Sequence, residues 1–368
     1  MILLDHGPGG PALFDAPREV VAAWDPAEVG PALLRLDRAR EAGAFVAGWV
    51  AFEAAAAFEP RLGGLKRGPG PLLAMGVFDG PRRPDLGGSP GPARLAPPEP
   101  MIARAAYDEA IARVLGYIAA GDCYQVNLTF PLASRLSGAP LDLWRLLRAA
   151  GPVGHGSFAD LGAGPVLASL SPELFVRVDA RGRITTRPMK GTAPRDPDPA
   201  RDAELAVALQ ESPKARAENL MIVDLLRNDI SRLARPGTVR VPDLYRIEPY
   251  ATVHQMTSTV TGELADPPSL SRLLPALFPC GSVTGAPKIR AIEIIDEIEA
   301  HPRGPYCGAI GWMGPDGACD FAVAIRTLAI EGREVRLGVG GGIVADSTAE
   351  GEWEEALWKA RFLRPALT

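Results

Sequence analysis

A lysine within a tight turn is the first residue whose surroundings suggest chemistry. Residues 187–195 read RPMKGTAPR. Pro188 fixes its own φ and restricts the residue before it, while Gly191 allows a sharp turn and a close approach of the backbone to a ligand. Lys190 therefore lies at a bend after a strand predicted over residues 182–186. It is either a solvent-exposed lysine, as most lysines are, or a nucleophile at the floor of a site.

Acidic side chains on two predicted helices could hold a divalent cation. Glu218 precedes an apolar run, and Glu352, Glu355 and Lys359 lie at i, i+3 and i+7 on the last predicted helix. Surface ion pairs of Glu218 with Lys214 and of Glu355 with Lys359 would also explain these residues. If Glu218 and Glu355 instead face one another, they suit Mg²⁺, which few carboxylates and several waters hold.

Glycines and an arginine indicate where an anion could bind. Gly338–Gly342 ends a predicted strand, where glycine weakens pairing and clustered backbone N–H groups form an anion cradle. A plain glycine-rich turn is the alternative. Ser282 precedes a helix predicted to start at Thr284, and helix N-termini favour anions. Arg326 interrupts an apolar strand predicted over residues 321–330, so a ligand carboxylate would suit its bidentate fork.

Two further titratable groups could move protons. Glu173 lies between two predicted strands with apolar neighbours, which would raise its pKa and suit it to act as a general acid. His254 lies in a strand predicted over residues 253–264 and could orient groups or shuttle protons. A structural histidine is the alternative at this position.

The elements that must position these residues are of mixed type. Predicted strands near the C-terminus follow one another through short loops, as in a meander rather than in βαβ units. The pattern predicts an α+β fold with large antiparallel sheets flanked by helices. Residues 1–100 are predicted to form a short N-terminal α/β part packed on the core, ending in a Pro/Gly-rich loop over residues 80–100. Residues 101–368 are predicted to form the catalytic domain.

Period and turn signals give the individual elements. Helices are predicted from Asp25, over residues 107–121, 141–150 and 202–233 with a break near Ser212, from Thr284, and from a capping box at Ser347–Glu350. Strands are predicted over residues 44–52, 72–78, 124–130, 154–160, 166–171, 175–178, 182–186, 238–241, 253–264, 306–313, 321–330 and 335–344.

Composition limits the partners of this chain of 368 residues. Its net charge of -5 argues against nucleic acid or an acidic membrane surface as a partner. The four cysteines form no C-x-x-C pair, which is typical of a reduced, cytoplasmic protein. The first residues lack the apolar region of a signal peptide, and no apolar run reaches the length that spans a membrane. A soluble cytoplasmic protein is therefore expected.

Over about residues 100–365 the ordered motifs resemble the chorismate-utilising enzymes. Seven stretches carry this resemblance, namely AAGDCYQVNL at 119–128, SPE at 171–173, ENLMIVDLLRND at 218–229, FPCGSVTGAPK at 278–288, GPYCG at 304–308, AIRT at 324–327 and GGGIVADS at 340–347. The resemblance implies the antiparallel fold of that family, chorismate as the substrate and Mg²⁺ as the cofactor.

The resemblance also implies roles for individual residues. Lys190 would attack C2 of chorismate, Glu173 would protonate the departing C4 hydroxyl, and His254 would be a further catalytic group. Glu218 and Glu355 would hold Mg²⁺. The substrate's carboxylates would meet the remaining site residues, Gly191, Thr192, Ser282, Tyr306, Arg326, Gly340, Gly341, Gly342 and Lys359.

Lysine before Gly191 and Thr192 is typical of the family members that make 4-amino-4-deoxychorismate in the folate branch. A small residue there is typical of anthranilate-forming members, which are one alternative. A second alternative is an inactive subunit that only docks a glutaminase. Isochorismate- and salicylate-forming members fit less well, since they activate water. No glutaminase motif is present, so ammonia is expected from solution or from a separate glutamine amidotransferase subunit. The short N-terminal part contains no recognisable tryptophan feedback motif.

Overall fold

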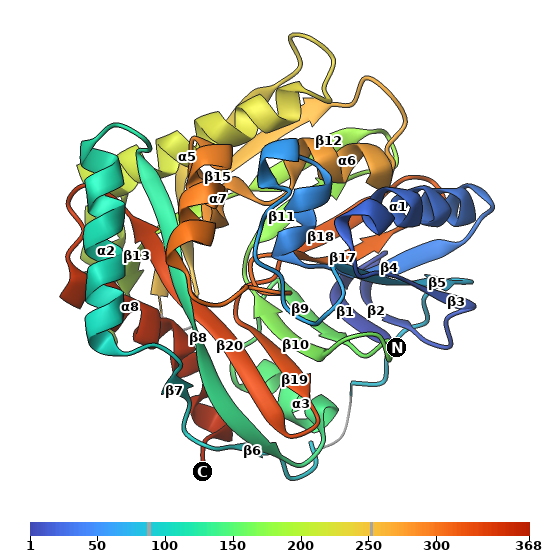
Figure 1. Cartoon of the computed structure of the whole chain (residues 1–368), viewed down its shortest axis with the longest axis horizontal. Coiled ribbons are helices and arrows are strands. Elements are labelled where there is room, and N and C mark those ends of the chain that lie inside the picture. The colour runs from blue at the N-terminus through green and yellow to red at the C-terminus, as the bar shows by residue number, and fades with distance from the viewer. Residues whose placement is uncertain (87–89, 251–252) are drawn as a thin grey trace.

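Two large antiparallel sheets form the framework of the chain (Figure 1). A computed structural model describes residues 1–86, 90–250 and 253–368. Within these residues each sheet has ten strands, and all strand pairs in the sheets are antiparallel. This confirms the predicted α+β class with large antiparallel sheets. Of the loop predicted over residues 80–100, residues 87–89 lie outside the described part of the chain.

The first sheet has the order β16-β8-β20-β19-β10-β9-β1-β2, and β6 and β7 also pair with β8. Its strands are β1 (Ile2–Gly7), β2 (Gly10–Phe14), β6 (Arg94–Leu95), β7 (Glu99–Pro100), β8 (Gln125–Ser137), β9 (His155–Ala159), β10 (Val166–Ser171), β16 (Gly285–Ala286), β19 (Thr327–Glu331) and β20 (Glu334–Ile343).

The second sheet has the order β13-β15-β12-β11-β18-β17-β4-β5-β3, and β14 pairs with β15. Its strands are β3 (Glu19–Ala23), β4 (Phe45–Val50), β5 (Leu73–Phe78), β11 (Leu174–Val178), β12 (Arg183–Arg187), β13 (Met189–Pro194), β14 (Arg240–Pro249), β15 (Val253–Glu263), β17 (Ala309–Met313) and β18 (Cys319–Val323). Strands from residues 1–100 thus enter both sheets, and the domain division at residue 100 stays a prediction.

Helices flank the sheets, and two of the expected boundaries carry capping residues. Asp25 caps α1 in a full capping box, and Ser212 ends α4 and caps α5, as the predicted break there required. The helices are α1 (Pro26–Glu41), α2 (Arg104–Ala119), α3 (Pro140–Ala150), α4 (Pro199–Glu211), α5 (Pro213–Ser231), α6 (Leu270–Leu277), α7 (Lys288–Ile298) and α8 (Ala349–Lys359), with 3₁₀ turns η1 (Phe52–Ala57), η2 (Pro60–Leu62), η3 (Gly281–Val283) and η4 (Ala360–Ala366). None of the described helices is long and apolar enough to cross a membrane.

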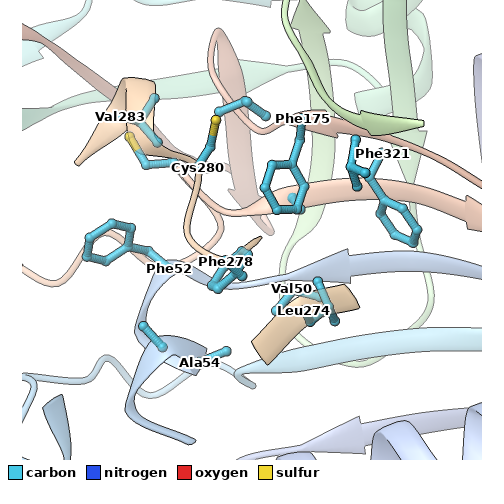
Figure 2. Close-up of a cluster of buried hydrophobic side chains, with 14 of the residues drawn as sticks. Val50, Phe52, Ala54, Phe175, Leu274, Phe278, Cys280, Val283 and Phe321 are labelled. Carbon is cyan, nitrogen blue, oxygen red and sulfur yellow. The ribbon is translucent and has the colours of Figure 1, made fainter. Parts of the chain in front are cut away.

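The core packs against the turn that carries Ser282 (Figure 2). Phe278 makes an edge-to-face contact with Phe175 of β11, with ring centroids 6.1 Å apart. Phe52, Cys280 and Val283 are buried in the same cluster. Burial of these side chains gives the turn little freedom to move, because protein interiors are close-packed. The core therefore fixes one wall of the site described below.

Three local predictions were wrong. Residues 321–330 do not form one strand, because β18 and β19 belong to different sheets and Arg326, with φ 50°, lies at the crossing between them. The helix predicted from Thr284 begins only at Lys288, because β16 first pairs with β8. Ser282 therefore lies in η3 and not at a helix N-terminus. Thr348, not Ser347, caps α8, accepting the Gly351 N–H.

Candidate active site

A cavity of about 390 Å³ gathers most of the predicted site residues. Its walls come from β13, α5, η3, β20 and α8, which lie far apart in the sequence. The predicted residues that line it are Glu173, Lys190, Gly191, Thr192, Glu218, Ser282, Tyr306, Arg326, Gly340, Gly342, Glu355 and Lys359. His254 and Gly341 do not line it.

Lys190 owes its position to an irregularity in β13. The pairing of β13 with β15 shifts register between Met189 and Thr192, and Gly191 adopts φ 89°, which glycine tolerates best. The Gln255 amide fixes this bulge, because its Nε2 donates to Gly191 O at 2.9 Å and its Oε1 accepts from Thr192 Oγ1 at 3.0 Å. The lysine is thereby held toward the cavity.

The surroundings of Lys190 favour its neutral amine. Loss of bulk water lowers the pKa of Lys190, and the Lys359 ammonium lowers it further. The lysine Nζ lies close to the backbone of Gly342, where an added Cβ would be 3.1 Å from it. The same Cβ would lie 2.9 Å from Nε2 of Gln125, whose buried amide has no hydrogen bond to any described residue. A side chain at position 342 would therefore collide with both neighbours.

Glu173 has the properties of a proton donor. Its side chain is 3% exposed, and burial raises its pKa to about 7. The Ser282 hydroxyl and the Lys190 ammonium reduce this rise without removing it. Its Oε1 has no hydrogen-bond partner among the described residues. A carboxylic acid that is protonated near neutral pH and lines the cavity can serve as a general acid.

The acids of α5 and α8 meet across the cavity. Glu218 of α5 and Glu352 and Glu355 of α8 all line it. Burial raises the pKa of Glu218, and burial together with Glu355 raises that of Glu352. Burial acts in the same direction on Glu355, but Lys359, whose Nζ lies 2.7 Å from Oε1, lowers the pKa of Glu355 overall. The predicted Glu355–Lys359 pair thus exists and belongs to the cavity.

That Glu218 and Glu355 hold Mg²⁺ stays a prediction, and the chemistry of the carboxylates present is compatible with it. Within the described residues no group of three or more Asp, Glu, His or Cys side chains is arranged to hold a metal ion. Mg²⁺ commonly takes only one or two protein carboxylates and keeps water and substrate oxygens as its other ligands. Hard oxygen donors whose mutual proximity disfavours ionisation would gain from a cation between them. Glu218 and Glu355 therefore remain the candidate ligands, with Glu352 beside them.

Other residues of the cavity lining suit an anion. The Arg326 guanidinium has no hydrogen bond or ion pair with any residue that the structure describes, and burial lowers its pKa. The cavity that Arg326 lines is also lined by Gly340, Ser282, Thr192 and Tyr306. The Lys359 Nζ donates a hydrogen bond to Gly340 O at 2.7 Å. An unpartnered arginine in a cavity is suited to a ligand carboxylate.

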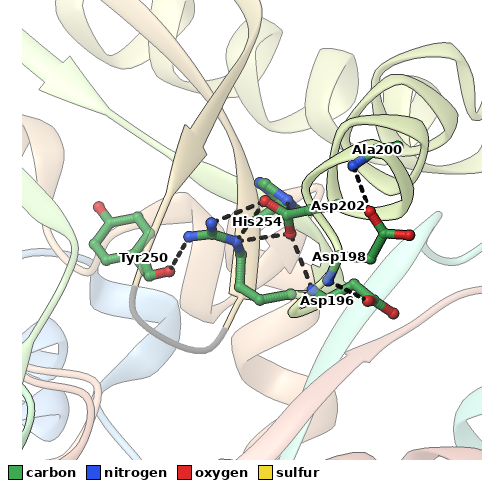
Figure 3. A network of polar contacts seen from close by, with 7 residues as sticks. Asp196, Asp198, Ala200, Asp202, Tyr250 and His254 are labelled. Atoms are coloured by element: carbon green, nitrogen blue, oxygen red, sulfur yellow. Dashed lines mark hydrogen bonds and ion pairs between the residues drawn. The ribbon is translucent and has the colours of Figure 1, made fainter.

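His254 is placed differently from its prediction. It points away from the cavity, and its Nε2 lies 2.8 Å from Oδ1 of Asp202 on α4 (Figure 3). Arg195 binds the same carboxylate and the carbonyl of Tyr250. Successive residues of a strand point to opposite faces, so on β15 Gln255 faces the cavity and His254 does not. These contacts favour the alternative of a structural histidine.

We expect His254→Ala to lower the melting temperature while leaving kcat close to the wild-type value. The variant removes one partner of a network that joins α4 to β13 and β15, and leaves the cavity walls in place. Thermal unfolding and steady-state kinetics measure the two effects. Gln255→Leu is the matched comparison, since it should reduce kcat through the Lys190 bulge. A large kcat loss in His254→Ala at unchanged stability would contradict this assignment.

Several cavity residues were missed in the sequence. Asn127 and Gln125 are polar residues on a strand that is otherwise buried, which was the available signal, and Gln255 directly follows His254. Lys214 and Glu352 were noticed only as members of helix-surface patterns. Of these five residues, Asn127, Gln255, Lys214 and Glu352 line the cavity, and Gln125 does not. Gly341 instead faces α8, where an added Cβ would lie 2.9 Å from Oε2 of Glu352.

The fold and this cavity define a class of protein, the chorismate binding enzymes. The model of that family matches residues 15–365, and the chain belongs to it. Aminodeoxychorismate synthase component 1 of Escherichia coli is 46% identical over 258 residues, 70% of this chain and 56% of that protein. Anthranilate synthase component 1 of Streptomyces coelicolor is 41% identical over 303 residues, 82% of this chain and 58% of that protein. The chain spans somewhat more than half the length of these relatives.

Solved structures agree with this assignment. The crystal structure of anthranilate synthase component I from Streptococcus pneumoniae superposes with a TM-score of 0.82 at 26% identity, covering 96% of this chain and 91% of that one. The chain thus has the fold of a chorismate binding enzyme as well as the sequence of that family. Its relatives include both anthranilate synthases and aminodeoxychorismate synthases. The choice between these two activities therefore depends on the residues of the cavity.

Proposed function

We propose that this chain is the large subunit of an aminodeoxychorismate synthase, converting chorismate and ammonia to 4-amino-4-deoxychorismate on the route to para-aminobenzoate and folate. One observation supports the proposal, namely that a lysine with a lowered pKa lines the same cavity as a buried acid with which it interacts. A built-in amine can occupy C2, which leaves C4 for ammonia. The proposed partner is a separate, soluble glutamine amidotransferase subunit in the cytoplasm.

The first step forms a covalent adduct. The neutral Lys190 amine attacks C2 of the ring, the double bonds shift, and the C4–O bond breaks. Glu173 donates its proton to the C4 oxygen, which leaves as water. Arg326, Tyr306 and the amides along β20 hold the enolpyruvyl carboxylate, so that the ring is oriented between the amine and the acid. Nucleophile and acid in fixed positions convert an unfavourable encounter into an intramolecular reaction.

The second step releases the lysine. Ammonia attacks C4, the double bonds shift back, and the C2–N bond breaks with its electron pair returning to Lys190. Proton transfer from the new ammonium group regenerates the neutral amine or the Glu173 carboxylic acid. Over both steps chorismate and ammonia give 4-amino-4-deoxychorismate and water.

Glu218 and Glu355 are the proposed Mg²⁺ ligands. The bound ion would supply electrostatic stabilisation for the ring carboxylate and withdraw electron density from the diene. We expect EDTA to abolish turnover and Mg²⁺ to restore it. Glu218→Gln and Glu355→Gln should each raise the Mg²⁺ concentration needed for half-maximal rate. Glu354→Gln is the control, since Glu354 is exposed on the same helix and does not line the cavity. Full turnover in excess EDTA would remove the ion from the mechanism.

The nitrogen source gives a second prediction. We expect the purified chain to aminate chorismate with ammonium salts and to ignore glutamine, because it contains no glutaminase motif. Adding the glutaminase subunit should confer use of glutamine. Initial rates with each nitrogen donor, from the chain alone and from the mixture, measure this. Glutamine-dependent turnover by the chain alone would contradict the prediction.

Anthranilate formation is the second candidate, favoured by the anthranilate synthases among the relatives of more than 40% identity. In that reaction ammonia would attack C2 and pyruvate would be eliminated, with Lys190 a bystander. Mass spectrometry of the product from chorismate, ammonium and Mg²⁺ decides between the two. Aminodeoxychorismate supports the proposal, and anthranilate with pyruvate overturns it.

A further inference from the structure

The wall of the cavity at Tyr306 is thin. Behind it lies a second cavity of about 280 Å³, and Tyr306 and Gly338 line both cavities. The Tyr306 ring rests directly on Gly338, where an added Cβ would lie 2.1 Å from the ring. Because there is empty space behind the wall, close packing alone cannot hold it in place. Other contacts must fix its position.

Besides backbone hydrogen bonds, a buried guanidinium makes such contacts. Arg303 Nη1 donates to Val283 O at 2.8 Å, and Nη2 donates to Asn127 O at 2.6 Å. Val283 follows Ser282 in η3, Asn127 lies on β8, and Tyr306 is three residues beyond Arg303. All three of these segments line the substrate cavity. Backbone hydrogen bonds already join β8 to the end of η3, since the Asn127 N–H donates to Thr284 O. Arg303 adds a side-chain link between these two walls and connects both to the segment that carries Tyr306.

Two buried acids hold Arg303, Glu299 at its guanidinium and Glu53 at its backbone. Glu299 accepts Nε at 2.9 Å and Nη2 at 2.6 Å in a bidentate pair, and also accepts the Thr129 N–H at 2.8 Å. Glu53 of η1 accepts the backbone N–H of Arg303 at 2.6 Å and that of Gly304 at 3.1 Å. The Phe52 ring lies 4.5 Å from the guanidinium carbon. The planar fork of arginine meets these partners together, which a lysine ammonium could not.

We propose that Arg303, fixed by Glu299 and Glu53, is a positioning residue that sets the relative placement of Asn127, Ser282 and Tyr306 around the substrate. Arg303 has no role in bond making. It acts on substrate binding through the cavity walls, and Glu53 makes the N-terminal part of the chain a component of the site. The inference rests on the proposed function only in taking chorismate as the ligand.

Arg303→Lys tests this, with Arg148→Lys as a matched control. Arg148 also forms a bidentate pair with an acid, Asp5, and stacks over an aromatic ring, Trp144, but does not line the cavity. We expect the KM for chorismate, and its Kd by calorimetry, to rise at least tenfold in Arg303→Lys with a smaller change in kcat. Arg148→Lys should lower the melting temperature without moving either constant. Glu53→Gln is a milder change that should also raise the KM for chorismate. It serves as the test if Arg303→Lys fails to fold.

Hydrogen–deuterium exchange supplies a readout independent of turnover. Residues 281–285 and 304–308 should exchange faster in the Arg303 and Glu53 variants than in wild type. Faster exchange with an unchanged Kd for chorismate would overturn the positioning role, and so would unchanged exchange in variants that fold. A wild-type product other than aminodeoxychorismate would overturn the proposed function alone, since chorismate affinity and exchange would still test the network.

Discussion

Lys190→Ala is expected to abolish the covalent adduct and to slow aminodeoxychorismate formation by several orders of magnitude. A correctly placed amine can have an effective concentration of about 10⁵ M or more, which dissolved ammonia cannot approach. Residual amination should shift toward C2, because nothing then occupies that carbon. Single-turnover kinetics with product analysis by mass spectrometry would measure both effects.

Wild-type protein without ammonia gives the complementary result. Incubated with chorismate and Mg²⁺, it should accumulate a species heavier by chorismate minus water, and peptide mapping should place the addition on Lys190. Lys214, which also lines the cavity, should carry none, and Lys214→Ala should retain the adduct. If Lys190→Ala made aminodeoxychorismate at the wild-type rate, Lys190 would not be the nucleophile.

Glu173→Gln is expected to lower kcat by about 10²–10⁴-fold, the usual contribution of a general acid. Glutamine keeps the size of the side chain but cannot donate the proton that the C4 oxygen needs on departure. Chorismate binding should change much less, because the protonated acid and the amide are both neutral. Rates measured at saturating chorismate would separate the two effects.

The pH dependence follows from the two pKa shifts. Glu173 must be protonated, and its pKa is about 7, so kcat should fall as pH rises through about 7. Lys190 must be neutral, and because its pKa is lowered, the limb in which kcat rises with pH moves to lower pH. Glu173→Gln should lose the alkaline limb. Burial also raises the pKa of Glu53 to about 7, but Glu53→Gln should keep that limb because Glu53 does not line the substrate cavity.

The chemical inventory of the site was accessible from the sequence. Lys190 beside Gly191, the acid in Ser-Pro-Glu, and the glycines of residues 340–342 are residue types with few roles at such positions. Their local environment is set by neighbours in the chain, such as the glycine that permits φ 89° after Lys190. Hydrophobic periodicity likewise gave most helices and strands, since each element must bury one face.

The strand assignments that failed depended on distant partners. Arg326 lies where the chain leaves one sheet for the other, and only the pairing of β18 with β17 and of β19 with β20 reveals that crossing. Similarly, Gly285 and Ala286 become a strand because β8 lies beside them. Short sequences that can form a strand or another element adopt the one that a neighbouring strand stabilises. The propensities of their own residues therefore could not predict the secondary structure here.

Which residues share the cavity was decided by tertiary structure alone. His254 and Gln255 are neighbours in one strand, and the sequence predicted the strand without its phase relative to the site. The pairing of β15 with β13 sets that phase and places Gln255 against the bulge, where its Nε2 donates to Gly191 O. Glu218 and Glu355 formed plausible surface patterns on separate helices. The sequence left open whether each acid pairs on its own helix surface or shares a site with the other. The fold decides this by placing both along one cavity, because charges so far apart in the sequence interact only through space.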